Sequence, residues 1–197
     1  MTQSYGSGQI FVLVGPGGAG KNTLMKMVLP RIENLSQLAT ATTRAIRPGE
    51  QENREHLFVS LDTFNQWIQD GKLLEFQEVH PGRFYGVPRA PLEEAFREGR
   101  DLIADIEIAG AEKILAAFPD NTVLIFIAAP SLDVLERRMR ERGESEQGVR
   151  DRMARAEREM AFAMNCPVYI VNHDLDKASE ELEQAILKAR ETRKVEA

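Results

Sequence analysis

The sequence predicts an α/β fold of three layers, in which helices cover both faces of a parallel sheet. Four short apolar runs have the length and composition of strands that are buried on both faces. Helical patterns lie between these runs, so that strand alternates with helix along the chain. The apolar runs are IFVLV at 10–14, LIADI at 102–106, VLIFIA at 123–128 and VYIV at 168–171.

The predicted helices have clear stop signals. Their apolar periodicity covers 21–29, 110–117, 132–142, 149–163 and 175 to about 193. Pro30 follows the first of them and Gly143 follows the third. Proline cannot continue a helix, and glycine commonly ends one, so both boundaries have a physical cause.

Residues 40–95 break this alternation and predict a small mixed α+β lobe inserted into the sheet domain. The lobe contains the strand-like runs HLFVS, LLEFQEV and GRFYGV, and a helix at about 62–70 that ends at Gly71. The polar segment RERGESEQGVRDR joins two helices, which is typical of a mobile helical lid. We expect one domain over 1–197, with a core at about 9–39 and 96–193, an acceptor-binding lobe at about 40–95 and a lid at about 138–152.

Composition narrows the possible partners. The chain has 197 residues, a net charge of -6 and a pI near 5.3, which argues against a nucleic-acid-coating protein or an anionic membrane partner. The single cysteine, Cys166, excludes an internal disulfide framework and fits a reducing compartment. No apolar run approaches the roughly 20 residues of a membrane span. We expect a cytoplasmic protein.

Residues 15–23, GPGGAGKNT, lie between the first predicted strand and the first predicted helix. Gly15, Gly20 and Lys21 match the phosphate-binding pattern G-x-x-x-x-G-K-[ST]. The glycines allow backbone N–H groups to face one anion, and the lysine meets the outer phosphates. A P-loop NTPase fold is therefore predicted, with ATP bound by Gly15, Gly17, Gly18, Ala19, Gly20, Lys21, Asn22 and Thr23.

Asn22 departs from that pattern, which places a hydroxyl here for Mg²⁺. Its amide still offers a neutral oxygen, and magnesium commonly keeps several waters in its coordination shell. Adenylate kinases resemble this loop and carry glycine at the same place, followed by threonine, as Thr23 follows here. We expect Mg²⁺ as cofactor, with Asn22 as a weak ligand.

Arginines flank the predicted lid. Phosphoryl transfer spreads negative charge over the moving group, and arginines stabilise it. Six arginines lie on either side of the lid: Arg137, Arg138, Arg140, Arg142, Arg150 and Arg152. Glu136 and Glu141 provide helical partners for some of them, so only two or three of the six should contact phosphate. The candidates, together with Lys21, are Arg138, Arg142 and Arg152.

A series of motifs is similar, in order and spacing, to the signature of guanylate kinases. The motifs are ATTRAIRPGE at 41–50, LLEF at 73–76, GRFYG at 82–86, DIEIAG at 105–110, APS at 129–131, RERGE at 140–144 and VNHDLDKA at 171–178. The similarity covers about residues 9–190. It implies a kinase of purine nucleotide metabolism that transfers the γ-phosphoryl group of ATP to GMP or dGMP, as a monomer or homodimer.

The resemblance also implies the acceptor-binding residues. Arg44, Arg47 and Tyr85 match the clamp on the acceptor phosphate, to which guanidinium forks are suited. Glu75 matches the guanine reader, because one carboxylate can accept from both N1–H and the N2 amine, whereas adenine presents an acceptor at N1. Asp105 and Glu107, at the carboxyl end of a central strand, face the base and the nucleotides.

Four positions in this set depart from the family pattern. Thr40 stands for a serine that bonds the base, and Val87 stands for a serine or threonine but cannot make that bond. His56 replaces a tyrosine of the phosphate clamp, and Glu107 replaces an aspartate. A lost neutral hydrogen bond costs about 0.5 to 1.5 kcal/mol, and the charge-assisted bonds of Glu75 are roughly twice as strong. Guanine selectivity should be weakened but not erased.

Two alternatives remain open from the sequence. Ribose bisphosphate kinases resemble the same family, lack the hydroxyl after the loop lysine and share the YGV of 85–87, but they lack the carboxylate corresponding to Glu75. Guanylate-kinase-like binding modules of scaffold proteins have lost catalysis, and they usually lose the loop lysine and the lid arginines that this chain keeps. The enzyme acting on GMP is our first choice.

Overall fold

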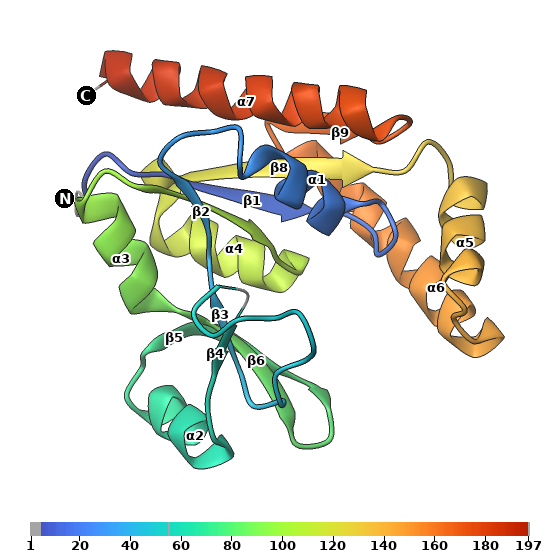
Figure 1. Cartoon of the computed structure of the whole chain (residues 1–197), viewed down its shortest axis with the longest axis horizontal. Helices are drawn as coiled ribbons and strands as arrows, with labels where there is room; N and C mark the ends of the chain where they lie inside the picture. Colours follow the sequence, from blue (N-terminus) through green and yellow to red (C-terminus); the bar gives the residue numbers. More distant parts are fainter. Residues whose placement is uncertain (1–4, 55, 197) are drawn as a thin grey trace. The chain divides into compact units, whose positions relative to one another are not determined.

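The computed structural model describes residues 5–54 and 56–196 (Figure 1). Its larger sheet has five strands in the order β2-β7-β1-β8-β9. The pairs β2–β7 and β8–β9 are parallel. The N–H groups of Leu102 and Ile106 donate to the carbonyls of Gln9 and Leu13, a step of four residues on each strand, so β7 also runs parallel to β1. The strands are β1 (Ile10–Val14), β2 (Leu35–Gln37), β7 (Asp101–Asp105), β8 (Thr122–Ala128) and β9 (Val168–Val171).

The five helices predicted between the strands are all present. They are α1 (Lys21–Val28), α4 (Ile108–Ala117), α5 (Leu132–Glu141), α6 (Glu146–Phe162) and α7 (Leu175–Glu196). α6 begins three residues earlier than predicted, because the Ser145 hydroxyl caps it by accepting from the N–H of Gly148 at 3.2 Å. The parallel sheet and these helices confirm the predicted α/β fold class.

The chain forms two compact units. The first contains the chain up to Ile10, Asn34–Ile103 and Ala109–Thr122, and the second contains Phe11–Glu33, Ala104–Ile108 and the chain from Val123 onward. The finer division into a core, an acceptor-binding lobe and a lid stays a prediction.

The first unit holds a small mixed sheet of order β4-β3-β6-β5. β3 pairs in parallel with β4, whereas β6 is antiparallel to both β3 and β5. The completely buried side chain of Phe64, from α2 (Leu61–Gln69), contacts Phe84 with ring centroids 5.6 Å apart. The strands are β3 (Thr40–Thr42), β4 (His56–Phe58), β5 (Leu73–His80) and β6 (Arg83–Pro88).

Among the strands and α-helices of residues 5–54 and 56–196, the sequence did not predict β2, β3 and α3 (Arg89–Arg97). β2 and β3 have three residues each, too few for a visible alternation. α3 contains Pro91, which lies in the first turn, where a backbone N–H needs no helical partner. The helix buries Phe96, whose ring packs edge-on against Phe118 at 5.2 Å.

In the second unit, α7 packs against α1 and β9 (Figure 1). α5 and α6 contact each other through a small apolar cluster of Leu135, Met139, Val149 and Ala156. Among the helices of residues 5–54 and 56–196, none is long and apolar enough to cross a membrane.

Candidate active site

The loop between β1 and α1 depends on glycines at two close approaches. Gly15 and Gly20 have φ angles of 131° and 98°, in the region that other residues rarely adopt. A Cβ atom at Gly15 would collide with the carbonyl oxygen of Ile127, and one at Gly20 would collide with the side-chain amide of Asn172. The backbone of this loop therefore has little freedom to accept other residues.

Lys21 is the first residue of α1 and turns back over the loop. Its Nζ donates to the carbonyl of Gly15 at 2.6 Å, and it lies 3.5 Å from Oδ1 of Asp105. The first turn of α1 has no acidic residue, so the positive end of the helix dipole is not neutralised by its own side chains. A helix start and a lysine thus offer positive charge at the same place, which suits an anion.

A cavity of about 260 Å³ opens at this loop. Its polar lining combines the loop with three carboxylates. The residues are Gly15, Gly17, Lys21, Asp105, Glu107 and Glu159. Asp105 and Glu107, predicted as acceptor-binding residues, therefore line the same cavity as the predicted ATP-binding loop.

Two carboxylates of this cavity, Asp105 and Glu159, have raised pKa values. Burial raises the pKa of Asp105, nearby Lys21 opposes that shift, and Glu107 adds to it. About a third of the Asp105 side chain stays accessible, so the shift reflects its place in a protein-lined cavity rather than complete enclosure. Burial also raises the pKa of Glu159, with Glu107 adding and Lys21 opposing. Three carboxylates around one lysine leave an excess of negative charge that a bound cation would relieve.

Asn22 and Thr23 follow Lys21 on α1 with exposed side chains, and neither lines this cavity. Gly18 and Ala19 complete the loop, and the carbonyl of Ala19 accepts a hydrogen bond from Asn172 Nδ2 at 2.7 Å. The predicted metal-ligand role of Asn22 stays a prediction.

The lid arginines occupy different environments. Arg152 is paired with Glu144, Nε to Oε2 at 3.1 Å, and its guanidinium lies beside Gly17 of the loop. Arg138 donates to the carbonyl of Asn172 at 3.0 Å. Arg142 is the exposed C-cap residue of α5. The structure thus places Arg152 beside the loop. It places Arg138 beside Asn172, which donates a hydrogen bond to Ala19 of the loop.

Sequence reasoning missed Asn172 and Glu159. Asn172 is 1% exposed, and its Oδ1 is buried without a hydrogen-bond partner in the described part of the chain. Asn172 lies inside the motif VNHDLDKA, which pointed to it without a role, whereas Glu159 is one charge among many on α6 and carries no local signal.

In the first unit, strand register places the predicted acceptor residues on one face of the small sheet. Thr40 is directly opposite His56, Thr42 is opposite Tyr85, and Glu75 is opposite Val87. Directly opposed residues share a face, as do residues two apart on one strand. Thr40, His56, Tyr85 and Glu75 therefore lie on the same face.

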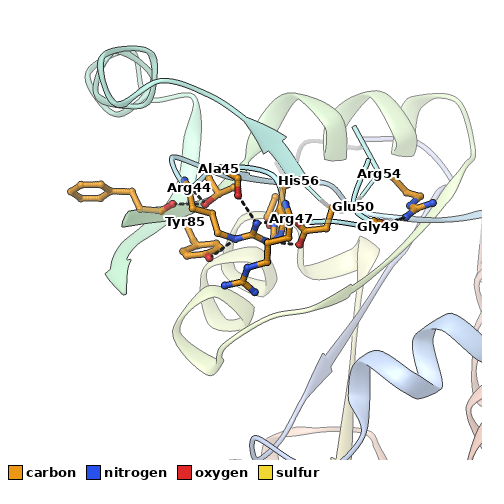
Figure 2. A network of polar contacts seen from close by, with 11 residues as sticks. Arg44, Ala45, Arg47, Gly49, Glu50, Arg54, His56 and Tyr85 are labelled. Carbon is orange, nitrogen blue, oxygen red and sulfur yellow. Dashed lines mark hydrogen bonds and ion pairs between the residues drawn. The ribbon is translucent and has the colours of Figure 1, made fainter. Parts of the chain in front are cut away.

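Arg44 forms the centre of a polar network beside this face (Figure 2). Its Nε donates to the Tyr85 hydroxyl at 2.9 Å, and its two terminal nitrogens donate to the two carboxylate oxygens of Glu50 at 2.7 and 2.5 Å. This pairing lowers the pKa of Glu50 to about 2, although burial opposes the shift, and the backbone N–H of Arg47 contributes to the lowering. The Arg47 side chain is exposed, and Figure 2 shows its guanidinium outside the Arg44–Glu50 pair.

Comparison with known proteins identifies the family. The family model described as guanylate kinase matches residues 7–189. The chain belongs to the guanylate kinase family. A guanylate kinase of Maricaulis maris is 41% identical over 91% of this chain and 82% of its own length, and one of Synechocystis is 40% identical over 93% of this chain and 96% of its own.

The fold agrees with a solved structure from the same family. The crystal structure of guanylate kinase from Anaplasma phagocytophilum has a TM-score of 0.72 and 30% identity, and the match covers 94% of this chain and 87% of that one. The guanylate kinase resemblance predicted from the motif series is thereby confirmed, as is the P-loop NTPase fold. The roles of individual residues stay predictions.

Proposed function

We propose that this chain transfers the γ-phosphoryl group of ATP to GMP or dGMP, giving ADP and GDP or dGDP. The observation that carries the proposal is Lys21 at the start of α1, hydrogen-bonded within a glycine loop and lining a cavity, in a chain that belongs to the guanylate kinase family. In the reaction, a phosphate oxygen of the acceptor forms a bond to Pγ, and the bond between Pγ and the β,γ-bridging oxygen breaks. The chain's residues contribute position and charge, with no covalent intermediate.

The loop of the second unit binds ATP in this proposal. Backbone N–H groups of residues 15–20 and the Nζ of Lys21 hold the phosphates, while Arg152 beside Gly17 neutralises charge on the transferred group. Lys21 exchanges its bond to the Gly15 carbonyl for a phosphate oxygen, a charge-assisted bond of greater strength.

Magnesium fits the chemistry of this cavity. The oxygens of Asp105, Glu107 and Glu159 are the hard ligands that the ion prefers, and their negative charge is in excess of that of Lys21. No group of three or more His, Cys, Asp or Glu side chains is arranged as a metal cage within the described residues. Because Mg²⁺ is commonly held by one or two carboxylates with phosphates and water, Asp105 and Glu107 would hold it, and Asn22 would be at most a peripheral ligand. The ion supplies charge neutralisation at the phosphates when bound.

The small sheet of the first unit binds the acceptor in this proposal. Arg47, Tyr85 and His56 contact the acceptor phosphate, and Arg44 adds charge from its fixed position against Glu50. Glu75 reads the guanine edge. Val87, directly opposite Glu75 and 2% exposed, contributes an apolar contact only. We also propose a cytoplasmic location for the enzyme, acting as a monomer or homodimer.

The test is an ATP-consumption screen with Mg²⁺ over GMP, dGMP, AMP, CMP, UMP and ribose 1,5-bisphosphate. GMP should be turned over well above the other bases. Lys21→Ala is the control for contaminating kinases, and its rate should fall by about a hundredfold or more with every acceptor. Turnover of the sugar phosphate alone would replace the acceptor assignment, equal rates on AMP would remove Glu75 as base reader, and no turnover with any acceptor would favour a binding module.

A further inference from the structure

The turn between α5 and α6 holds the backbone of Glu144 in a defined place. Gly143 has a φ angle of 76°, in the left-handed region that favours glycine. Its N–H donates to the carbonyl of Arg140 at 2.9 Å, and the N–H of Glu144 donates to the carbonyl of Met139 at 3.4 Å. These two bonds form the Schellman motif that ends many helices. The next residue, Ser145, caps α6, so Glu144 is fixed from both sides.

The Glu144 carboxylate, which no step of the proposed function uses, pairs with Arg152 on α6. Its Oε2 lies 3.1 Å from Nε of Arg152, and the Glu144 side chain is only 19% exposed. Glu146, which pairs with Arg140 in the same lid, is 63% exposed. Because solvent and salt screen a less exposed charge more weakly, the Glu144–Arg152 pair should restrain its arginine better than the open pair does.

The geometry of this pair leaves the far end of the Arg152 guanidinium beside the loop. A Cβ atom at Gly17 would lie 3.4 Å from Nη1 of Arg152, whereas Glu144 approaches Nε. Among residues 5–54 and 56–196, none forms a hydrogen bond with the terminal nitrogens of Arg152. In contrast, both terminal nitrogens of Arg44 donate to Glu50. Arg152 can therefore keep its carboxylate partner and still offer two nitrogens to a phosphate.

The lid meets the loop at a second, apolar point. A Cβ atom at Gly18 would lie 3.0 Å from Cδ1 of Leu135 on α5. Leu135 is completely buried and belongs to the apolar cluster that joins α5 to α6. Close packing of this kind leaves little room for one part to slide over another. The same two helices carry Glu144 and Arg152, so this contact sets the distance of the ion pair from the loop.

We propose that Glu144 is a positioning residue, which holds the guanidinium of Arg152 beside Gly17 so that its terminal nitrogens meet the transferred phosphoryl group. The contact with phosphate rests on the proposed function, but the ion pair does not. A free arginine side chain must lose rotamer freedom when it meets a phosphate, and pairing with Glu144 removes part of that freedom before ATP binds. Because charge on the transferred group develops during the reaction, the effect should appear in kcat.

The first test measures the order of the Arg152 side chain without any turnover. ¹⁵N relaxation of arginine Nε–H groups is measured by NMR on the full chain without nucleotide, and Arg152→Lys identifies the signal. We expect an ordered Nε–H in the wild type and in Glu146→Gln, and a clearly lower order parameter in Glu144→Gln. An unchanged order parameter in Glu144→Gln, or a disordered Arg152 in the wild type, overturns the proposal whatever the substrate is.

The second test is a double-mutant cycle on GMP kinetics at saturating ATP. Glu144→Gln should lower kcat by about three- to tenfold, a fraction of the roughly hundredfold loss expected when Arg152→Gln removes the charge itself. KM for ATP should not change, and Glu144→Asp, which keeps the charge, should recover part of the rate. In an Arg152→Gln background, Glu144→Gln should have no further effect.

Two outcomes of this cycle would overturn the positioning role. A higher kcat in Glu144→Gln would mean that the ion pair restrains Arg152 away from the phosphate. An equal loss in both backgrounds would mean that Glu144 acts on another group.

The controls separate failure of this proposal from failure of the proposed function. Glu146→Gln is the matched change, because it removes another lid carboxylate whose Oε1 lies 3.1 Å from an arginine Nε, that of Arg140; its kcat should equal that of the wild type. If Arg152→Gln keeps the wild-type kcat, Arg152 does not contact the transferred group, and the phosphate contact fails in both proposals. If the wild type turns over no acceptor, the NMR comparison alone decides whether Glu144 orders Arg152.

Discussion

The glycine loop of the second unit and the small sheet of the first unit, the two phosphate sites that we propose, are built in different ways. The loop would bind phosphate mainly through its backbone, whose conformation is fixed where Gly15 and Gly20 closely approach Ile127 and Asn172. In the sheet, side chains from three strands and a connecting loop meet through register, as Thr40 meets His56 and Tyr85 meets Arg44.

That difference explains which substitutions each region tolerates. A backbone site keeps its N–H groups when a neighbouring side chain changes, so Asn22 need not abolish phosphate binding. A side-chain site changes its donors with each substitution, so His56 and Val87 alter it directly. Lys21 donates to the backbone carbonyl of Gly15 and lies 3.5 Å from Asp105, whereas Arg44 donates to both carboxylate oxygens of Glu50. Four expected effects, from the largest to the smallest, sharpen the contrast.

Removing the loop lysine should have the largest effect. Lys21→Ala should reduce kcat with GMP by about a hundredfold or more, as expected for loss of an electrostatic contact to the transferred group. Lys26→Ala, an exposed change in the last turn of the same helix, is the control. Steady-state rates at saturating ATP provide the measurement, and a loss within tenfold would contradict the assigned role of Lys21.

Neutralising the base reader should come next. Glu75→Gln should lower kcat/KM for GMP by about 30- to 150-fold, or about 2 to 3 kcal/mol, because both charge-assisted bonds weaken. Glu78→Gln on the same strand is the matched control, since its side-chain oxygen accepts from the N–H of Gly82 in the hairpin turn. Comparable losses in the two variants would place Glu75 outside the acceptor site.

The Arg44–Glu50 pair should appear in the pH dependence of stability. The pKa of Glu50 is lowered to about 2 in the folded chain, so its ionised form favours folding above the unfolded-state pKa of about 4.5. That contribution should be lost as pH falls from about 5 towards 2. Urea unfolding of wild type and Glu50→Gln between pH 7 and 3 should therefore converge at the acid end, and parallel curves would contradict the coupling.

Changing Asn22 should have the smallest effect. Asn22→Ala should cost less than about tenfold in kcat, the size of one neutral interaction, because the side chain is exposed and the loop backbone is unchanged. Asn22→Ser should preserve or raise activity and lower the Mg²⁺ concentration that gives half-maximal rate. A loss in Asn22→Ala as large as that in Lys21→Ala would give Asn22 an essential role.

The sequence predicted the parts of the fold whose signals are local. Buried apolar runs, helix stops and the glycine loop identified β1, β7, β8, β9 and five helices within a few residues. β2 and β3 were missed because three residues are too few to show a period, and α3 was missed because its Pro91 resembles a breaker unless the helix start is known. Tertiary pairing, rather than propensity, creates these elements.

The sequence predicted which residues belong to the candidate site, but it did not predict the contacts between them. The family resemblance identified Arg44, Thr40 and His56 as site residues. Nothing in the local sequence indicated that Arg44 would pair with Glu50 or that Thr40 would form a hydrogen bond with His56. Such pairs arise from strand register and loop closure, which depend on segments brought together only by folding. Glu159 was invisible for the same reason, since only the folded chain places it beside Lys21 in the cavity.

The hydrogen bond from Asn172 to the carbonyl of Ala19 joins positions 153 residues apart. The side-chain amide of Asn172 also occupies the space that a side chain at residue 20 would need. The conformation of the loop therefore depends on the residue that follows β9. The nine residues GPGGAGKNT therefore do not determine the conformation of the loop by themselves. If these residues were grafted between another strand and helix without an equivalent of Asn172, the loop would lose the hydrogen bond and the packing contact that fix its backbone conformation.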